Sequence, residues 1–512
     1  MRLLFACLLT FSSAWCTRDH VHGLHEEQPA RAGADLPNIV FLLADDLGYG
    51  DVQYNGGNAS TPNLDAMASG PNSIQLSRYY SGGPVCSPTR GTFLTGRNHN
   101  RYCIWHANTG SNKDDFVVPE KLPLPTSEIT VADILKKHGY QTAIFGKWHL
   151  GDVKPVAGGN KKWPVSHPGM HGFDEWWVTE RSAMSANLNC ACFNASECPL
   201  GHYNDAPPCF NYYTVDPNTG LLVTLDQPIN GDDSHFLLKE FAHFLDSAVN
   251  SSQPFFVYLP FHTVHIRYLA TLGYIEQYFS KGYSMDDIDY YGAITAMDDA
   301  IGQLRQLLKS YNISDNTMLW FTSDNGPAKG TPGVTAGFRG RKGTLFEGGI
   351  RVPGIIEWPK MIKKNQKSDF PVVSSDFLPT VCDILGISPP TDRPIDGTSI
   401  LPFLRGEQST RNKSISWAYN IDGNFNGTYN AVINGDRYKV YADYHKGKIQ
   451  TAYLYDLVND PFETKDLSTK EPEMFASMKA ELEEWMQSVI KSATEVVKCY
   501  EYSHFTCEGE DC

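Results

Sequence analysis

The stretch "PNIVFLLADDLGYGD", residues 37–51, is the part of the sequence that most directly indicates a fold. Its apolar run from Asn38 to Ala44 predicts a buried strand, and this strand ends abruptly in two carboxylates, Asp45 and Asp46. A strand that is apolar throughout is typical of a parallel sheet covered by helices on both faces. We therefore interpret this segment as a central strand of an α/β fold.

The alternation of strands and helices continues along the chain. Amphipathic patterns predict helices at about 130–138, from a cap at 232–234 to about 247, and at 284–308. Apolar runs predict strands within 140–151, 254–265 and 317–326. This order predicts a largely parallel sheet with helices on both faces. After about residue 405, short strands that read as antiparallel and a helix at about 471–490 predict a smaller α+β subdomain.

Polar side chains follow four of these predicted strands. Ligands of open α/β sheets bind beyond the carboxyl ends of the strands, so these side chains are expected to converge on one cleft. Any one of the clusters would also fit a solvated strand end or a helix cap. The polar residues are Asp45 and Asp46, Lys147 and His149, His265, and Asp324 and Asn325.

The N-terminus and composition predict a secretory protein. Residues 1–16, "MRLLFACLLTFSSAWC", have the layout of a signal peptide, so the mature chain is expected to begin near Thr17. No later apolar run is long enough to span a bilayer. The net charge of −15 argues against nucleic acid as a partner. A secreted or lysosomal glycoprotein is expected, with sequons at Asn58, Asn194, Asn250, Asn312, Asn412 and Asn426.

The chain has 12 cysteines, of which two lie in the predicted signal peptide. Cys382, in an amphipathic helical pattern, is expected to be a buried free thiol. Zinc at Cys190 and Cys192 is disfavoured, because their spacing does not suit a tetrahedral site. Cys86 has no evident partner. Eight cysteines are expected to pair in an oxidising compartment: Cys103, Cys190, Cys192, Cys198, Cys209, Cys499, Cys507 and Cys512.

The oxygen-bearing residues at the strand ends predict a metal site. Asp45, Asp46, Asp324 and Asn325 are hard donors that would repel one another without a cation, and Ca²⁺ suits them best in a secretory compartment, with Mg²⁺ as the alternative. A divalent cation beside fixed cations would bind a tetrahedral oxyanion, which means phosphate or sulfate. The cationic or proton-transferring residues expected nearby are Arg90, Lys147, His149, His265 and Lys342, although Lys342 also fits an exposed basic loop.

Two motifs resemble the signatures of the sulfatases. "CSPTR" at 86–90, followed by "GTFLTGR" at 91–97, resembles the first signature, and "GYQTAIFGKWHLG" at 139–151 resembles the second. The similarity extends from about residue 37 to "LYDLVNDPFETKDLS", which ends at residue 468. The chain is thus identified as a member of the formylglycine-dependent, type I sulfatases, and is similar to arylsulfatases and N-acetylgalactosamine-6-sulfatases.

The resemblance implies a fold and a modification. The fold would be alkaline-phosphatase-like: a large mixed, mostly parallel sheet between helices in a catalytic domain at 17–405, and a C-terminal antiparallel-sheet subdomain at 406–512. Cys86 would be converted to 3-oxoalanine (Cα-formylglycine) by the formylglycine-generating enzyme. Pro88 suits the first turn of a helix, which would place residue 86 at the helix N-terminus. The modified residue would join the four oxygen donors as a metal ligand.

The resemblance also implies a mechanism. One hydroxyl of the hydrated aldehyde would attack sulfur to give a covalent sulfo-enzyme intermediate, while Arg90 and Lys147 hold the sulfate. His265 or Lys342 would protonate the leaving alcohol, and His149 would deprotonate the second hydroxyl to release sulfate. The sequence departs from many relatives, which have proline two positions after the histidine that corresponds to His265. Arg267 stands there instead, and His262 lies close enough to compete for the role of acid.

Sulfate esters of carbohydrates are the expected substrates, with aryl sulfates as artificial ones. In the segment 172–193, Trp176 and Trp177 would stack on a sugar or aryl ring or else pack in the core, and Glu180 and Arg181 would bind polar groups of the substrate. The alternatives are a phosphate or phosphonate monoester hydrolase of the alkaline-phosphatase superfamily, and an inactive secreted binding protein. The latter would be expected to lack Cys86, Lys147 or His149, all of which are present.

Overall fold

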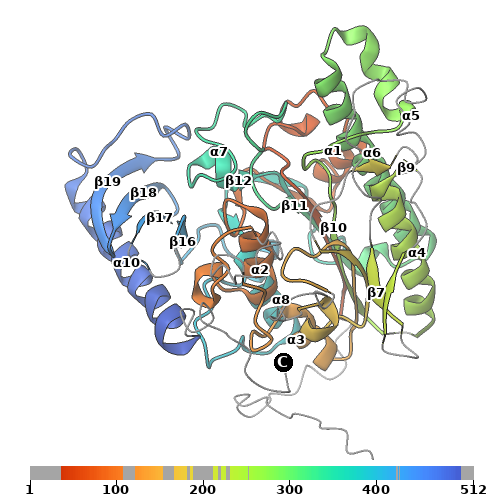
Figure 1. Cartoon of the computed structure of the whole chain (residues 1–512), viewed down its shortest axis with the longest axis horizontal. Coiled ribbons are helices and arrows are strands. Elements are labelled where there is room, and N and C mark those ends of the chain that lie inside the picture. The colour runs from red at the N-terminus through yellow and green to blue at the C-terminus, as the bar shows by residue number, and fades with distance from the viewer. Residues whose placement is uncertain are drawn as a thin grey trace, which may run out of the picture.

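The computed structural model of the chain describes residues 36–107, 122–153, 166–180, 185–187, 212–216, 221–225, 231–251, 253–421, 425 and 427–497 (Figure 1). Among the cysteines in these ranges, Cys103 is disulfide-bonded, whereas Cys86 and Cys382 are free and buried. No helix in the described ranges is both long and apolar enough to cross a membrane. The predicted signal peptide lies outside the described residues, as do Asn194, Asn426, Cys190, Cys192, Cys198, Cys209, Cys499, Cys507 and Cys512.

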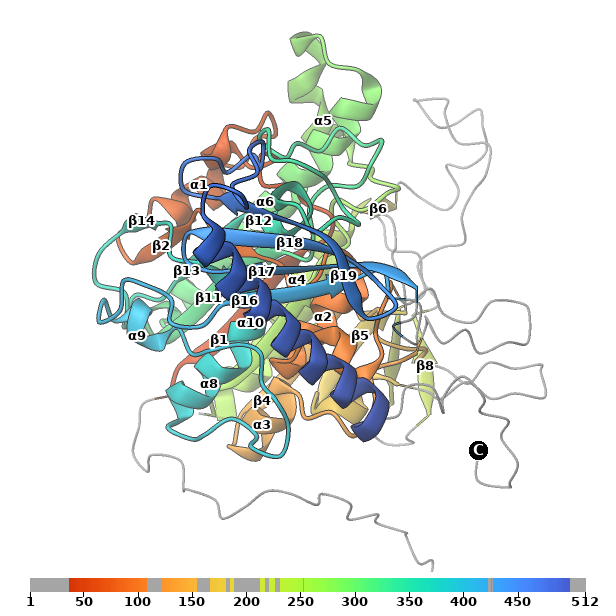
Figure 2. The same cartoon turned by 90° about the vertical axis from the view of Figure 1, so that its left-hand side faces the viewer.

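A ten-stranded mixed sheet forms the centre of the fold (Figures 1 and 2). In spatial order its strands are β14 (Gln366–Ser368), β2 (Ser73–Leu76), β13 (Gly354–Glu357), β11 (Thr317–Ser323), β1 (Asn38–Ala44), β10 (Phe255–Pro260), β4 (Gln141–Lys147), β5 (Glu175–Thr179), β7 (Tyr213–Val215) and β8 (Leu222–Thr224). The five strands from β11 to β5 are parallel, and β13 and β7 continue the sheet with antiparallel pairing. The predicted mixed, mostly parallel sheet is confirmed.

Helices cover both faces of this sheet, and the side chains of β1 pack alternately into two hydrophobic cores, one on each face. Phe41 and Leu43 face the core formed with α2, α3, α8 and α9, and Val40 and Leu42 face the core formed with α1, α4, α5 and α6. The helices are α1 (Pro62–Ala68), α2 (Cys86–Thr95), α3 (Val131–Lys137), α4 (Asp233–Ser251), α5 (Leu272–Ile275), α6 (Met285–Ser310), α7 (Glu347–Ile350), α8 (Phe377–Leu385), α9 (Leu401–Leu404) and α10 (Pro472–Lys491).

Helix starts follow the capping residues in the sequence. The Thr130 hydroxyl accepts a hydrogen bond from the Asp133 amide at the start of α3, and Ser284 does the same for Asp287 at the start of α6. In both capping boxes the aspartate side chain also accepts from the N-cap amide, so two otherwise unpaired amides are satisfied. These reciprocal bonds account for the agreement between the predicted and observed starts of both helices.

The C-terminal part of the chain forms a separate antiparallel layer (Figure 2). Its strands are β16 (Ile415–Tyr419), β17 (Thr428–Asn434), β18 (Tyr438–His445) and β19 (Lys448–Asp456), and α10 packs across them through Met478, Leu482, Met486 and Val489. The antiparallel subdomain with its helix is confirmed, while the boundary near residue 405 stays a prediction. The remaining small sheets are β12 (Arg351–Val352), β3 (Tyr79–Tyr80) and β15 (Val372–Val373), and β6 (Ala186–Asn187) with β9 (Gly231–Asp232).

A buried ionic cluster joins this layer to the rest of the fold. The Nζ atom of Lys439, in β18, lies 3.0 Å from Oε1 of Glu347 in α7 and 2.8 Å from Oε1 of Glu463. The Tyr80 hydroxyl donates to the other oxygen of Glu347 at 3.0 Å. All of these charges are removed from water, so each depends on its partners for stabilisation.

We expect Lys439→Met to lower the free energy of unfolding by about 3–5 kcal/mol, because the change leaves two buried carboxylates without their ammonium partner. Urea unfolding followed by tryptophan fluorescence measures this loss. The control is Lys448→Met, at an exposed position of β19, for which a change within about 0.5 kcal/mol is expected. Equal stability of the two variants would contradict the assigned role of the cluster.

Candidate active site

The carboxyl ends of β1 and β11 bring the predicted oxygen donors together. Asp45 and Asp46 follow β1, Asp324 and Asn325 follow β11, and the two strands are adjacent and parallel. The Asp46 amide donates to Oδ1 of Asp324 at 3.1 Å, and the Asn325 side-chain amide donates to Oδ1 of Asp46 at 2.7 Å. All four residues are buried. The two pairs lie at least 278 positions apart in sequence but form one cluster.

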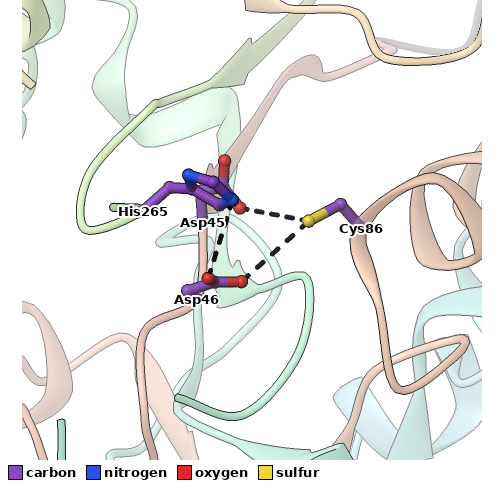
Figure 3. A group of neighbouring side chains, drawn as sticks. All are labelled: Asp45, Asp46, Cys86 and His265. Carbon is purple, nitrogen blue, oxygen red and sulfur yellow. Dashed lines mark hydrogen bonds and ion pairs between the residues drawn. The ribbon is translucent and has the colours of Figure 1, made fainter. Parts of the chain in front are cut away.

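Cys86 is the first residue of α2, and its side chain faces Asp45 and Asp46 (Figure 3). Its Sγ atom lies 3.4 Å from Oδ1 of Asp45 and 3.9 Å from Oδ1 of Asp46. Pro88 occupies the first turn of the helix, where its missing N–H leaves no intrahelical bond unmade. Residue 86 therefore lies at the positive end of a ten-residue helix, where the helix dipole favours an anion.

Two fully buried cations, Arg90 and Lys147, contact the carboxylates of the cluster. The Arg90 guanidinium forms two hydrogen bonds to Oδ2 of Asp324, at 3.1 and 2.8 Å, and a third to the Lys147 carbonyl at 2.7 Å. The Lys147 ammonium lies 2.6 Å from Oδ2 of Asp45. The helix that carries residue 86 and the strand β4 are thus joined to the carboxylates by charge-assisted hydrogen bonds.

Lys342 reaches the site from the loop between β11 and α7. Its Nζ atom lies 2.5 Å from Oδ1 of Asp46 and 3.4 Å from Sγ of Cys86. Backbone hydrogen bonds hold the loop in place, since the Lys342 amide donates to the Pro327 carbonyl and the Gly343 amide to the Pro84 carbonyl. The side chain is 19% exposed, so interpreting it as part of an exposed basic loop was wrong.

The histidines of the site differ in what they face. His265 is 19% exposed at the side chain, and its Nε2 lies 3.9 Å from Oδ2 of Asp46. His262 is fully buried and uses both ring nitrogens, toward Thr179 and Asp233. Only His265 of this pair therefore faces the carboxylate cluster. His149 is buried, and its Nδ1 has no hydrogen-bond partner among the described residues.

Burial and neighbouring charges set the electrostatics of the site. Burial raises the pKa of Asp46 and Asp324, whereas for Asp45 the cations led by Lys147 outweigh burial and hold its pKa well below its usual range. Burial, followed by the nearby carboxylates, raises the pKa of the Cys86 thiol. An unmodified thiol here would stay protonated, which makes it a poor nucleophile.

The donor set fits a hard divalent cation. Oδ2 of Asp46 and Oδ1 of Asn325 are buried without a hydrogen-bond partner among the described residues, and such atoms call for a ligand. Carboxylate and amide oxygens are the groups that Ca²⁺ and Mg²⁺ prefer. Among the histidine, cysteine, aspartate and glutamate side chains of the described ranges, one atom each from Asp45, Asp46, Cys86 and His265 lies within 4.8 Å of the other three, so this group could hold one ion.

The two tryptophans considered for substrate stacking belong to a sheet strand. Residues 175–179 form β5, paired with β4 on one side and β7 on the other. Trp176 is 4% exposed within one core, and Trp177 is half-buried against the other. Core packing is therefore the correct interpretation for Trp176, whereas Trp177 is only partly buried. The Glu180 carboxylate accepts a hydrogen bond from the Val153 amide at 3.1 Å, and Arg181 lies outside the described residues.

The fold, with carboxylates, cations and a buried cysteine gathered at its strand ends, defines a class of hydrolase for esters of tetrahedral oxyanions. The sequence profile named "Sulfatase" matches residues 37–387, and the chain belongs to the sulfatase family. A second profile, named "N-sulphoglucosamine sulphohydrolase, C-terminal", matches residues 339–492. The chain is therefore a sulfuric ester hydrolase, and the alternative of an inactive binding protein is wrong.

Two relatives and one solved structure illustrate the similarity. The chain is 33% identical to the N-acetylgalactosamine-6-sulfatase of Mus musculus over 395 residues, which cover 74% of this chain and 69% of that protein. It is 30% identical to the steryl-sulfatase of Homo sapiens over 451 residues, which cover 75% of this chain and 72% of that protein. The crystal structure of Ps i-CgsB in complex with k-i-k-neocarrahexaose superposes with a TM-score of 0.72 at 26% identity, covering 92% of this chain and 98% of that one.

Proposed function

We propose that the protein hydrolyses sulfate monoesters of carbohydrates by means of Cys86 oxidised to Cα-formylglycine, and that aryl sulfates serve as artificial substrates. The observation that carries this proposal is the position of Cys86, which begins α2, lies 3.4 Å from both Asp45 and Lys342, and is a free cysteine. Its sulfur lies beside two carboxylates and an ammonium, which is unusual for a thiol with only a structural role.

We assign the metal to Asp45, Asp46, Asp324, Asn325 and the modified residue 86, and we propose Ca²⁺ as the ion. When bound, the ion would polarise an oxygen of the substrate or nucleophile and offset negative charge. The aldehyde hydrate would supply one hydroxyl to attack sulfur and a second through which sulfate can be released. Arg90 is already fixed by three hydrogen bonds, so it holds the helix start and the carboxylates in a constant arrangement.

The positions of the side chains support the remaining assignments. Lys342, beside Cys86 and Asp46, and Lys147, beside Asp45, are assigned to hold sulfate oxygens. We assign leaving-group protonation to His265, because it is partly exposed and faces the cluster. His149, with its unpartnered Nδ1, is assigned to accept a proton from residue 86.

The carbohydrate class is supported by the name of the murine relative, an N-acetylgalactosamine-6-sulfatase, and by the complex of Ps i-CgsB with a neocarrahexaose. The steryl-sulfatase among the relatives makes a steroid sulfate the competing substrate class. We further propose that the protein enters the secretory pathway through residues 1–16, where the formylglycine-generating enzyme would modify Cys86, and is secreted or lysosomal.

The test is hydrolysis by protein purified from a eukaryotic secretory host. We expect kcat/KM for 4-nitrophenyl sulfate to exceed that for 4-nitrophenyl phosphate by about 100-fold or more, because the second charge of the phosphate would face buried carboxylates. N-acetylgalactosamine 6-sulfate and a steroid sulfate are compared in the same assay. Preference for the phosphate would contradict the proposal and favour a phosphate or phosphonate hydrolase.

A further inference from the structure

Just beyond β10, the imidazole of His262 joins three segments of the fold. Its Nε2 lies 2.8 Å from the hydroxyl oxygen of Thr179, at the end of β5, and its Nδ1 lies 2.8 Å from Oδ2 of Asp233, the first residue of α4. The second oxygen of Asp233 accepts a hydrogen bond of 2.5 Å from the Tyr212 hydroxyl. All four residues are buried, so water does not compete for these bonds.

The polarity of this network orients the ring. A carboxylate only accepts hydrogen bonds, so Nδ1 of His262 donates to Asp233. In the neutral ring Nε2 is then the acceptor and receives the Thr179 hydroxyl proton. Both ring nitrogens are satisfied by fixed partners, which leaves a single tautomer and a single ring orientation. The carboxylate acts here on the histidine in the way that carboxylates orient histidines elsewhere in enzymes.

A backbone turn connects the fixed position of His262 to His265. The two residues are the first and last of a four-residue turn, in which the His265 amide donates to the His262 carbonyl at 2.9 Å. The middle of the turn is bonded to the end of β1, because the Asp45 amide donates to the Thr263 carbonyl at 2.8 Å and the Val264 amide donates to the Asp45 carbonyl at 2.6 Å. The turn is thus held on one side by Asp45 and on the other by the imidazole of His262.

A second connection leads from the same ring to β4. The carbonyl of Thr179, the residue that binds Nε2 of His262, accepts a hydrogen bond of 3.0 Å from the Trp148 amide. Trp148 stands between Lys147 and His149. One imidazole therefore lies between the turn that carries His265 and the segment that carries these two residues.

We infer that His262, oriented by Asp233 and Thr179, is a positioning residue that sets the approach of His265 to the leaving-group oxygen. This inference rests on the proposed role of His265 as the acid that protonates the leaving alcohol. His262 is fully buried and does not touch substrate, so it acts only through His265 and the turn. Small displacements of a group in proton transfer are costly, about 100-fold in rate for roughly 1 Å.

The experiment uses two esters that differ in their need for a proton. Phenol is a poor leaving group, whereas 4-nitrophenol departs readily without protonation. We expect His262→Gln, which keeps a donor and an acceptor but not the ring geometry, to lower kcat for phenyl sulfate by about 100-fold. For 4-nitrophenyl sulfate the expected loss is less than about 5-fold, with KM for both esters within about 2-fold of wild type.

Matched variants separate positioning from general destabilisation. Thr179→Val removes the hydroxyl that binds Nε2 of His262 and should show the same unequal loss, whereas Thr179→Ser keeps the hydroxyl and should restore the wild-type ratio. His99→Gln makes the same substitution at another fully buried histidine, whose Nδ1 lies 2.6 Å from the Ile104 carbonyl oxygen. Any loss of kcat in His99→Gln should be equal for the two esters. In a His265→Ala background, adding His262→Gln should lower kcat for phenyl sulfate by less than a further factor of about 3.

Equal losses for both esters in His262→Gln and Thr179→Val, or losses that multiply in the His265→Ala background, would overturn the inference. If His262→Gln does not fold, the inference is tested by the ratio of kcat values for the two esters in Thr179→Val and in Thr179→Ser. A wild-type protein that hydrolyses neither ester would overturn the proposed function and the inference with it. Active wild-type protein with equal losses would overturn the inference alone.

Discussion

Replacing Cys86 with alanine is expected to lower kcat for 4-nitrophenyl sulfate by at least about 10⁴-fold, because the change removes the nucleophile while leaving the surrounding charges in place. The small side chain fits the space of the buried thiol, so folding should be retained. Steady-state hydrolysis and a thermal unfolding scan on the same preparation measure both properties.

The matched control for this variant is Cys382→Ala. Cys382 is the other free, buried cysteine of the described chain, and it lies in α8 within a hydrophobic core. We expect its replacement to cost about 1 kcal/mol of stability and to change kcat less than about 3-fold. Comparable losses of activity in the two variants would show that Cys86 has no special chemical role.

Cys86→Ser refines the same prediction. A serine offers one hydroxyl on its side-chain carbon, so it can accept sulfate once but lacks the second hydroxyl through which sulfate would be expelled. We expect a burst of 4-nitrophenol close to one equivalent per enzyme and then turnover reduced by at least about 10³-fold. Sustained turnover by this variant would contradict release through a second hydroxyl of residue 86.

Removal of the divalent cation is the second change with a large expected effect. We expect EGTA to abolish hydrolysis and to lower the midpoint of thermal unfolding by about 2–4 °C, because an ion present at about 100 times its Kd stabilises a protein by about 2.7 kcal/mol. Added Ca²⁺ should reverse both effects. Differential scanning calorimetry with and without Ca²⁺ provides the measurement, and a larger shift with Mg²⁺ would assign that ion instead.

Two aspartate variants control for nonspecific binding of the ion. Asp324→Asn removes a charge from the buried cluster and is expected to eliminate the Ca²⁺-dependent shift. Asp299→Asn removes a partly exposed carboxylate in α6 that is bonded to His235, and it should leave the shift unchanged. A shift that persists in Asp324→Asn would place the ion elsewhere.

Much of the fold could be predicted because local patterns and tertiary structure agree. The apolar run of β1 is buried on both faces, and the capping residues Thr130 and Ser284 start their helices where the sequence indicates. Trp176 and Trp177 were open to two interpretations because the segment between Asp174 and Glu180 is too short for its apolar pattern to separate a strand from a loop. Its identity depends on pairing with β4, whose residues lie 32 positions upstream of their partners in the sheet register, as in Ile144 with Trp176.

The candidate site was predictable in its membership but not in its geometry. Strand ends identified Asp45 and Asp324, and motif resemblance identified the role of Cys86. Sequence alone left His262 and His265 as competing acids, because both follow the same strand and only the turn decides which ring is buried. The partners of His262 come from β5 and α4, and no spacing in the sequence indicates that these two segments meet at one imidazole.

The most direct test of the central claim is the mass of the tryptic peptide from Tyr79 to Arg90, prepared from protein secreted by a eukaryotic host. The proposed oxidation of Cys86 to the aldehyde predicts a mass about 18 Da below that of the cysteine peptide. An unmodified or disulfide-bonded Cys86 in protein that still hydrolyses sulfate esters would contradict the formylglycine mechanism.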